Sequence, residues 1–365
     1  MHDPSQPVVV NERSSASSPP KWRRPLSIAL SLAIVVGVFV FAIPKIADYG
    51  AVIDTLRRLT WIELSSLVLA TTFNLFTYWL ANMAAVPGLS LGRAALLTQS
   101  TTSVANTLPA GGAIAVGLTY EMLRSWRFTA TAATLYVAVT GIWNIFLKLA
   151  LPVVSVALLA LTGQGSAAFV TAALIGLAVL AAAVGVLTAI FWKEELAHSV
   201  GELGGRVAAF VTRLFRRPPP QGFGDRAVRF RRETVGLVRR RWVALTVTTI
   251  VSHLALFVVL LFSLRHVDAS AAEISTVQVL AVFAFGRLIS ALPVTPGGLG
   301  VIELGYIGGL VAAGGQQAEV VAAVLLFRLL TYGVQIPVGA VTYLIWRRGT
   351  SAGRSGRPSR SAVQV

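Results

Sequence analysis

Three charged residues stand in a largely hydrophobic C-terminal region of the chain: Arg287, Glu303 and Arg328. An isolated charge at the centre of a membrane costs about 2.5–3.5 kcal/mol on insertion scales, so such residues usually face one another or a wet cavity. One interpretation is a polar pocket that binds the charged group of a substrate. The other is a structural salt bridge in which Glu303 neutralises one arginine, and both interpretations can hold for different arginines.

The run between Arg287 and Glu303 predicts a broken helix. Its prolines and glycines are Pro293, Pro296, Gly297, Gly298 and Gly300. Hydrocarbon offers no water to unpaired amides, so an irregular backbone at membrane depth needs protein cover or a polar cavity beside it. The glycines allow a headgroup to approach the backbone, and a helix that starts there can direct free amides at an anion such as phosphate. Close packing or a plain turn is the alternative, since glycine is common in membrane helices.

A similar run lies in the first half of the chain. The segment Leu108-Pro109-Ala110-Gly111-Gly112 is followed by Tyr120 at the spacing that separates Gly298 from Tyr306. The first-half candidates for a binding site are Asn106, Pro109, Gly111, Gly112, Glu121, Arg124 and Lys148. An exposed surface pair is the alternative for Glu121 and Arg124, and snorkelling to the membrane interface is the alternative for Lys148. Three further residues are expected to form hydrogen bonds between helices: Asn74, Asn82 and Asn144.

The composition indicates the class of protein that carries these residues. Of the 365 residues, 55% are hydrophobic and 13% are charged, and the hydrophobic residues fall in long blocks. This pattern is typical of an all-α, polytopic helical membrane protein. The net charge of +16 lies mainly in two tails and one internal loop, which indicates topology and attraction to anionic lipids rather than nucleic-acid binding. The chain has no cysteine, which excludes thiolate chemistry, and no histidine–acid grouping predicts a metal site or another cofactor.

Basic segments divide the chain into two membrane halves. We expect a disordered cytoplasmic tail over 1–25, a first membrane half over 26–192, a basic cytoplasmic linker over 193–241, a second membrane half over 242–346 and a basic, disordered cytoplasmic tail over 347–365. Each half is expected to contain one re-entrant, broken-helix element, at about 94–118 and about 276–313. Both termini are therefore expected on the cytoplasmic side of the plasma membrane.

The parity of the crossings predicts the orientation of the two broken elements. With the N-terminal tail inside, spans at 26–43 and 61–82 return the chain to the cytoplasmic side before the first element. After the linker, the span at 242–264 leads outward, so the second element starts from the outside. Such an inverted repeat is the architecture of many transporters whose substrate site lies near the midplane. About six full crossings with two re-entrant elements, or about eight to ten crossings, fit the same parity.

The run 293–303, preceded by Arg287 and followed by the segment 327–332, resembles the signature of the lysylphosphatidylglycerol synthase transmembrane-domain family. The resemblance covers residues 26–346 and implies a flippase-like membrane domain, with headgroup-binding roles for the second-half candidates. The first half departs from the family pattern, because Gly117 precedes a leucine and the acid and arginine after it come late. Bifunctional relatives carry a soluble aminoacyltransferase domain after the membrane region. This chain ends at Val365 without one, so we expect no lysyl transfer and no enzymatic activity.

We therefore expect a protein that binds and translocates a polar-headed lipid, either a phospholipid or a polyprenyl-linked lipid. A headgroup that crosses hydrocarbon needs a substitute for its water shell, which a polar pocket with arginines and free amides would provide. Two alternatives stay open, a non-catalytic membrane partner of a cell-envelope lipid or glycan synthase and a membrane enzyme that modifies lipids. The expected partners are anionic or zwitterionic membrane lipids, with no nucleic acid, and the oligomeric state stays open.

Overall fold

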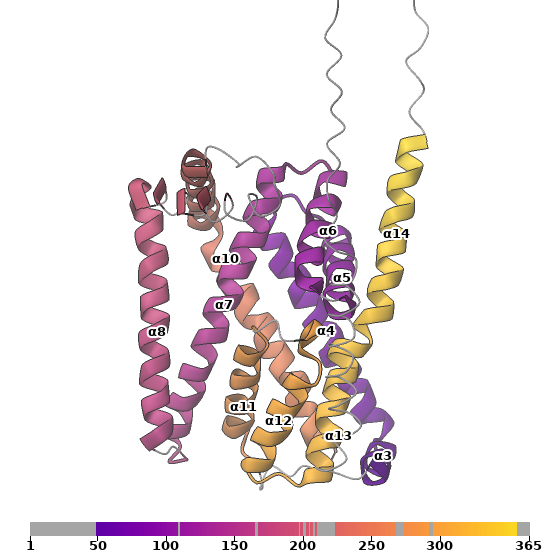
Figure 1. The fold of residues 1–365 in the computed structure, drawn as a ribbon. Helices are drawn as coiled ribbons and strands as arrows, with labels where there is room; N and C mark the ends of the chain where they lie inside the picture. Colours follow the sequence, from indigo (N-terminus) through magenta and orange to yellow (C-terminus); the bar gives the residue numbers. More distant parts are fainter. Residues whose placement is uncertain are drawn as a thin grey trace, which may run out of the picture.

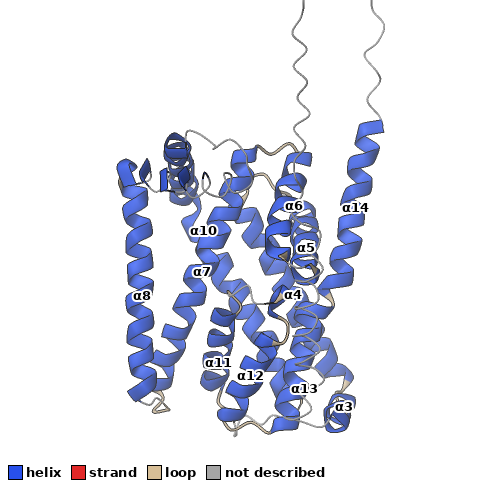
Figure 2. Cartoon of the chain, viewed as in Figure 1, coloured by secondary structure: helices blue, strands red, loops and turns tan. Residues whose placement is uncertain are grey.

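The computed structural model describes residues 49–108, 110–164, 167–196, 198–199, 202–203, 205–206, 209, 223–267, 274–291 and 295–355. The described residues are helical with short connections and no strand, which confirms the predicted all-α class (Figures 1 and 2). The expected tail over 1–25, the expected first span at 26–43 and most of the segment 207–222 lie outside the described residues.

The first half of the chain forms helices α3 to α8. Their bounds are α3 (Tyr49–Arg57), α4 (Trp61–Ala85), α5 (Leu91–Thr107), α6 (Gly111–Ser125), α7 (Ala130–Leu161) and α8 (Ala167–Trp192). Local signals determine where α4 begins: the Thr60 hydroxyl accepts the Glu63 amide at 3.3 Å, and the Glu63 carboxylate accepts the Thr60 amide at 2.7 Å. This reciprocal capping satisfies two amides that the helix itself leaves unpaired.

The second half of the chain forms the helices from α10 onward. Their bounds are α10 (Phe223–His266), α11 (Thr276–Ile289), the short turn η2 (Pro296–Gly298), α12 (Val301–Ala312), α13 (Gln317–Arg328), the π-turn η3 (Leu329–Gly333) and α14 (Gln335–Ser355). The start of α11 repeats the device found at α4, because Ser275 and Gln278 cap each other's amides. Each half thus contains a long helix followed by a broken pair.

The helical extents differ from the sequence expectations at three places. Residues 223–241, expected in the linker, form the start of α10, and residues 347–355, expected in a disordered tail, form the end of α14. Arginine is a good helix former, so a helix already formed by the apolar span can continue through these basic segments. The expected span at 319–346 is interrupted by η3, where the Val334 amide bonds to the Leu329 carbonyl at 2.8 Å. Pro337 lies one turn further on and cannot donate to the Gly333 carbonyl, which loosens this part of the helix.

Four described helical segments are long and apolar enough to cross a membrane: Trp61–Ala85, Ala130–Leu161, Ala227–His266 and Gln317–Thr350. Figure 1 shows α4 and α10 crossing the middle of the molecule, with α5 and α6 toward the end where α14 terminates and α11 and α12 toward the opposite end. Helix α5 packs against α14, and α11 packs against α7. Helix α4 also packs against α10, so the two halves are in contact along several pairs of helices. The protein is a polytopic helical membrane protein, as predicted.

The largest buried core lies around the second broken pair. Most of its residues come from α10, α11, α12 and α13, with Leu67 of α4 and Leu151 of α7. The Phe257 and Phe283 rings pack at 5.6 Å between centroids. Gly286 on α11 lets the Tyr306 ring of α12 lie directly against the α11 backbone, because a Cβ at this position would overlap that ring. This packing holds the two arms of the broken pair together and determines where the turn between them lies.

Candidate functional site

A cavity of about 780 Å³ lies between the two halves, where the turns of both broken pairs meet. Residues of α4, α5, α6, α7, α10 and α11 line it together with residues of η2, α12, α13, η3 and α14. The volume is within the range of small-molecule sites. Residues with amide, hydroxyl and phenol groups are among those that line it, including Asn74, Thr98 and Tyr78. The cavity can therefore accommodate a hydrated or polar group in the interior of a membrane domain.

The turn before α12 is built from glycines in the left-handed region of backbone space. Gly297, Gly298 and Gly300 have φ angles of 59°, 69° and 86°. Residues with a Cβ rarely adopt this region, so the turn requires glycine on conformational grounds alone. At Gly297 a Cβ would also overlap the Tyr332 ring and lie 2.9 Å from the Asn106 Oδ1. The glycine run thus permits both the sharp turn and its close approach to other helices.

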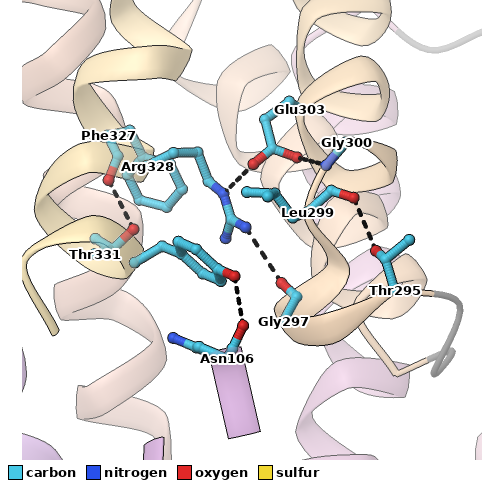
Figure 3. A network of polar contacts seen from close by, with 10 residues as sticks. Asn106, Thr295, Gly297, Leu299, Gly300, Glu303, Phe327, Arg328 and Thr331 are labelled. Atoms are coloured by element: carbon cyan, nitrogen blue, oxygen red, sulfur yellow. Dashed lines mark hydrogen bonds and ion pairs between the residues drawn. The ribbon is translucent and has the colours of Figure 1, made fainter. Parts of the chain in front are cut away.

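Glu303 and Arg328 form a buried ion pair that closes this turn. The Arg328 Nε donates to the Glu303 Oε1 at 2.5 Å, and its Nη2 donates to the Gly297 carbonyl at 3.2 Å (Figure 3). The other carboxylate oxygen accepts the Gly300 amide at 2.6 Å. The Glu303 side chain has 0% exposure and the Arg328 side chain 13%. A fully desolvated carboxylate needs such partners, so Glu303 has the structural role that the sequence left open.

The amides of the glycine turn are less free than the sequence suggested. The Gly298 amide donates to the Thr295 carbonyl at 3.0 Å, and the Gly300 amide donates to Glu303. Both already have an acceptor within the turn, so the expectation that they point at a phosphate does not hold for these two residues. At Gly300 the reason is that a carboxylate three residues into a helix is a strong acceptor for the first amides. At Gly298 the reason is that the turn supplies its own carbonyl.

Arg287 is held differently from Arg328, because a neutral side chain positions it. The His253 ring is 1% exposed, with Nδ1 3.0 Å from the Thr249 carbonyl and Nε2 3.3 Å from the Arg287 Nη2. A carbonyl only accepts, so Nδ1 carries the ring proton and Nε2 is the acceptor for the guanidinium. The Arg287 Nε is buried without an acceptor among the described residues. Among those residues, no carboxylate lies within 4.0 Å of the Arg287 guanidinium.

Lys148 reaches the same cavity from the first half of the chain. It lies on α7, four residues before Pro152, which is inside that helix. Proline cannot donate to the carbonyl four residues earlier, so the Lys148 carbonyl loses its usual partner and the helix is weakened at the cavity. No ion pair of Lys148 is present among the described residues. Its placement at the cavity agrees with the pocket interpretation rather than with snorkelling.

The cavity wall is strongly basic. Lys148, Arg287 and Arg328 line it, and among the described lining residues there is no Asp or Glu. Glu303, which is buried and does not line the cavity, neutralises Arg328. The formal charges of Lys148 and Arg287 remain without a protein counter-ion in this part of the structure. Since unpaired charges are costly in a membrane, the arrangement is suited to a bound anion.

The end of α5, which leads into the first broken turn, contacts both η2 and η3 of the second half. The Tyr332 hydroxyl donates to the Asn106 carbonyl at 2.7 Å, and the Arg328 guanidinium lies 4.5 Å from the centroid of the Tyr332 ring. In the first-half turn, Ala110 has a φ of 54° and the position of a Cβ on Gly111 would be 2.6 Å from two backbone oxygens of α5. The neighbouring Gly112 has open space at the same position. The predicted residues Asn106, Gly111 and Gly112 all line the cavity. Of the two glycines, only Gly111 lies where a larger side chain would overlap the backbone of α5.

The remaining predicted residues are elsewhere. Glu121 and Arg124 are exposed on α6 and do not line the cavity, and no ion pair joins them among the described residues. Pro293 and Pro109 lie outside the described residues, and Pro296 begins η2. The sequence did not assign His253 a role at this site or single out Tyr332 as a contact between the halves, although both are polar residues inside predicted spans.

The family comparison agrees with this architecture. Residues 28–339 match the family described as lysylphosphatidylglycerol synthase TM region, which covers both halves and both broken turns. The chain belongs to this family of membrane domains. A search of curated proteins found no match.

Proposed function

We propose that this protein binds a polar-headed lipid in the central cavity and translocates its headgroup across the bilayer. The single observation that carries the proposal is the pair of cations, Lys148 and Arg287, that face one polar cavity without a protein counter-ion in the described structure. A lipid phosphate supplies the missing anion, and charge-assisted hydrogen bonds from lysine and arginine replace its water shell. Membership of a lipid-synthase membrane family supports a lipid-related role.

The arrangement of the helices supports a transport mechanism with alternating access. The broken pair α5–α6 extends toward the middle from one end of the molecule, and α11–α12 extends toward it from the other (Figure 1). In our proposal these pairs are re-entrant elements of an inverted repeat, and α4, α7, α8, α10 and α13–α14 cross the membrane. Cavity residues come from both halves, so a rocking motion of one half against the other would expose the headgroup first to one side and then to the other.

The distribution of basic residues supports the proposed orientation. The end of α8, which leads into the basic segment 193–241, and the end of α14 lie at the same end of the molecule (Figure 1). Arg347 and Arg348 lie in this last part of α14. Lys and Arg accumulate on the cytoplasmic side of membrane proteins. We therefore place this end, and both chain termini, in the cytoplasm, with the protein in the plasma membrane.

Lipid transfer in proteoliposomes tests the proposed function. Purified protein is reconstituted with a trace of acyl-labelled phosphatidylglycerol, and the fraction of label that becomes accessible to an impermeant quencher is followed over time. Wild-type protein is expected to accelerate transfer over protein-free vesicles. Lys148→Met and Arg287→Met are expected to lower the rate at least about tenfold, which corresponds to about 1.4 kcal/mol. The matched control Arg124→Met removes an exposed arginine outside the cavity and is expected to retain the wild-type rate.

Two results would contradict this function. Transfer at the wild-type rate in both cavity variants would remove the cations from the mechanism. No transfer by folded wild-type protein, together with capture of a stoichiometric synthase, would instead indicate a membrane partner of that enzyme.

A further inference from the structure

We propose that the cavity selects lipids whose headgroup carries a net negative charge and no amine, a phosphodiester or polyprenyl phosphate bearing hydroxyl groups. This inference rests on the proposed function and specifies its substrate class. It follows from the charges of the wall: the described lining residues include three cations and no acid. An anionic headgroup gains favourable interactions throughout such a cavity, whereas an ammonium group finds like charges.

The one nearby acid is unsuited to receive a headgroup amine. Both Glu303 oxygens are already acceptors, one for the Arg328 Nε and one for the Gly300 amide. The carboxylate is fully buried and is not among the groups that line the cavity. An amine could bind there only by displacing Arg328, which would leave that guanidinium without its counter-ion. Breaking a buried pair in this way costs about 3–5 kcal/mol.

The two unpaired cations come from different halves of the protein. Lys148 is on α7 and Arg287 is on α11, and these two helices pack against each other. The Arg287 Nε has no acceptor among the described residues, and His253 orients the same guanidinium through its Nη2. A phosphate between the two side chains would satisfy both charges at once. The anion would thereby connect the halves at the seam along which they are proposed to move.

The neutral part of the wall suits hydroxyl groups. The polar residues Asn74, Thr98, Thr102, Ser290 and Thr331 are among those that line the cavity. The hydroxyls of Thr98, Ser290 and Thr331 each donate to a carbonyl one turn earlier, so they can offer a ligand an acceptor oxygen. The Asn74 Nδ2 already donates to the Ser252 carbonyl at 2.9 Å, which holds this amide in place on α4. Glycerol or sugar hydroxyls both donate and accept hydrogen bonds, so they match such groups without adding charge. These features favour a glycerol- or sugar-bearing phosphate over a zwitterionic headgroup.

The test compares three lipids of different headgroup charge in the same vesicles. Acyl-labelled phosphatidylglycerol, phosphatidylethanolamine and lysylphosphatidylglycerol, with net charges of about −1, 0 and +1, are used at equal trace amounts. Wild-type protein is expected to transfer phosphatidylglycerol at least about tenfold faster than the two amine lipids. Lys148→Glu, which places a carboxylate in the cavity and offsets the charge of Arg287, is expected to abolish the preference for phosphatidylglycerol over the lysyl lipid.

Matched variants separate selectivity from misfolding. Lys148→Met removes the charge without adding an acid and is expected to slow phosphatidylglycerol without accelerating the lysyl lipid. Arg124→Glu makes the corresponding charge reversal on the exposed face of α6 and is expected to keep the wild-type preference. Each variant is first checked for a single peak in size exclusion and for its unfolding temperature in detergent, so a loss of preference is interpreted only in folded protein.

The possible results distinguish a failure of the proposed selectivity from a failure of the proposed lipid transport. Equal or faster transfer of the lysyl lipid by wild-type protein would overturn the selectivity and leave lipid transport intact. The same preference in wild-type and Lys148→Glu protein would also overturn it, because the cavity charge would then be irrelevant. No transfer of any lipid would overturn the proposed function and the selectivity together. Uptake of radiolabelled inorganic phosphate, without lipid transfer, would identify a free anion as the ligand and exclude a lipid.

Discussion

The Tyr332 hydroxyl of the second half donates to the Asn106 backbone carbonyl of the first half at 2.7 Å. This hydrogen bond joins the end of α5, which leads into the first broken turn, to the π-turn η3 at the cavity. Asn106 and Tyr332 are far apart in the sequence, yet both lie within a few residues of a helix break. Helix α5 also contacts η2 beside it, where a Cβ on Gly297 would lie 2.9 Å from the Asn106 Oδ1. The end of α5 therefore connects the first broken turn with both η2 and η3, and the three together form one side of the cavity.

Removal of this hydrogen bond is expected to destabilise the protein modestly. Tyr332→Phe leaves the ring under Arg328 but leaves the Asn106 carbonyl without its donor, at a cost of about 0.5–1.5 kcal/mol. Thermal unfolding in detergent should therefore show a lower midpoint. Tyr343→Phe is the control, since the Tyr343 hydroxyl has no hydrogen-bond partner among the described residues. Equal midpoints for the two variants would show that the contact contributes nothing.

Loss of the Glu303 charge is expected to be far more damaging than loss of both charges. Glu303→Gln leaves Arg328 buried without its counter-ion, which costs about 3–5 kcal/mol, whereas Glu303→Gln combined with Arg328→Gln removes the uncompensated charge. The double variant should unfold at a higher temperature than Glu303→Gln alone. A double variant that is as unstable as the sum of its single variants would argue against the ion pair as the source of the effect.

The adjacent glycines Gly111 and Gly112 in the first-half turn are expected to differ sharply in their tolerance of substitution by alanine. Gly111→Ala places a methyl group 2.6 Å from the carbonyl oxygens of Val104 and Ala105, whereas Gly112→Ala places one in open space. Backbone atoms cannot move as a flexible side chain can, so only Gly111→Ala should reduce the yield of folded protein and the unfolding temperature. A comparison of the two purified variants by size exclusion and thermal unfolding is sufficient. Equal tolerance of both substitutions would contradict the close packing of α5 and α6.

The chain's lack of cysteine allows a direct test of orientation. A single cysteine at Gln317, the first residue of α13, is expected to react with an impermeant maleimide in intact cells. A single cysteine at Ser199, in the basic segment after α8, should react only after the cells are permeabilised. Both positions are exposed. The reverse labelling pattern would place the basic segments outside and contradict the proposed topology.

The sequence predicted the elements of the site better than the contacts within it. The glycine run indicated a helix break, and the structure confirms breaks at both predicted runs. The sequence could not show which arginine Glu303 would neutralise, because that depends on how α12 packs against α13. Because Glu303 pairs with Arg328, Arg287 is left facing the cavity without a carboxylate partner in the described structure. The role of Lys148 was equally open, since a lysine in a long apolar helix can snorkel or face inward depending on its neighbours.

The asparagines also show that a sequence can indicate a polar contact without identifying its partner. Asn74 bonds from α4 to the Ser252 carbonyl of α10, and Asn82 bonds to Thr98 of α5, so both form the predicted contacts between helices. The prediction was wrong for Asn144, whose amide donates to the Thr140 carbonyl one turn earlier in α7. An apolar span offers a polar side chain either its own backbone or a neighbouring helix. Only the packing of the helices decides between these partners.

The most direct test of the central claim is a cryo-EM structure of the protein in nanodiscs that contain phosphatidylglycerol. The account predicts a phosphate-sized density between the Lys148 and Arg287 side chains, continuous with lipid density, and its loss in the Lys148→Met variant. A cavity filled by side chains with both cations turned toward bulk solvent would contradict the account, as would a headgroup bound at another site.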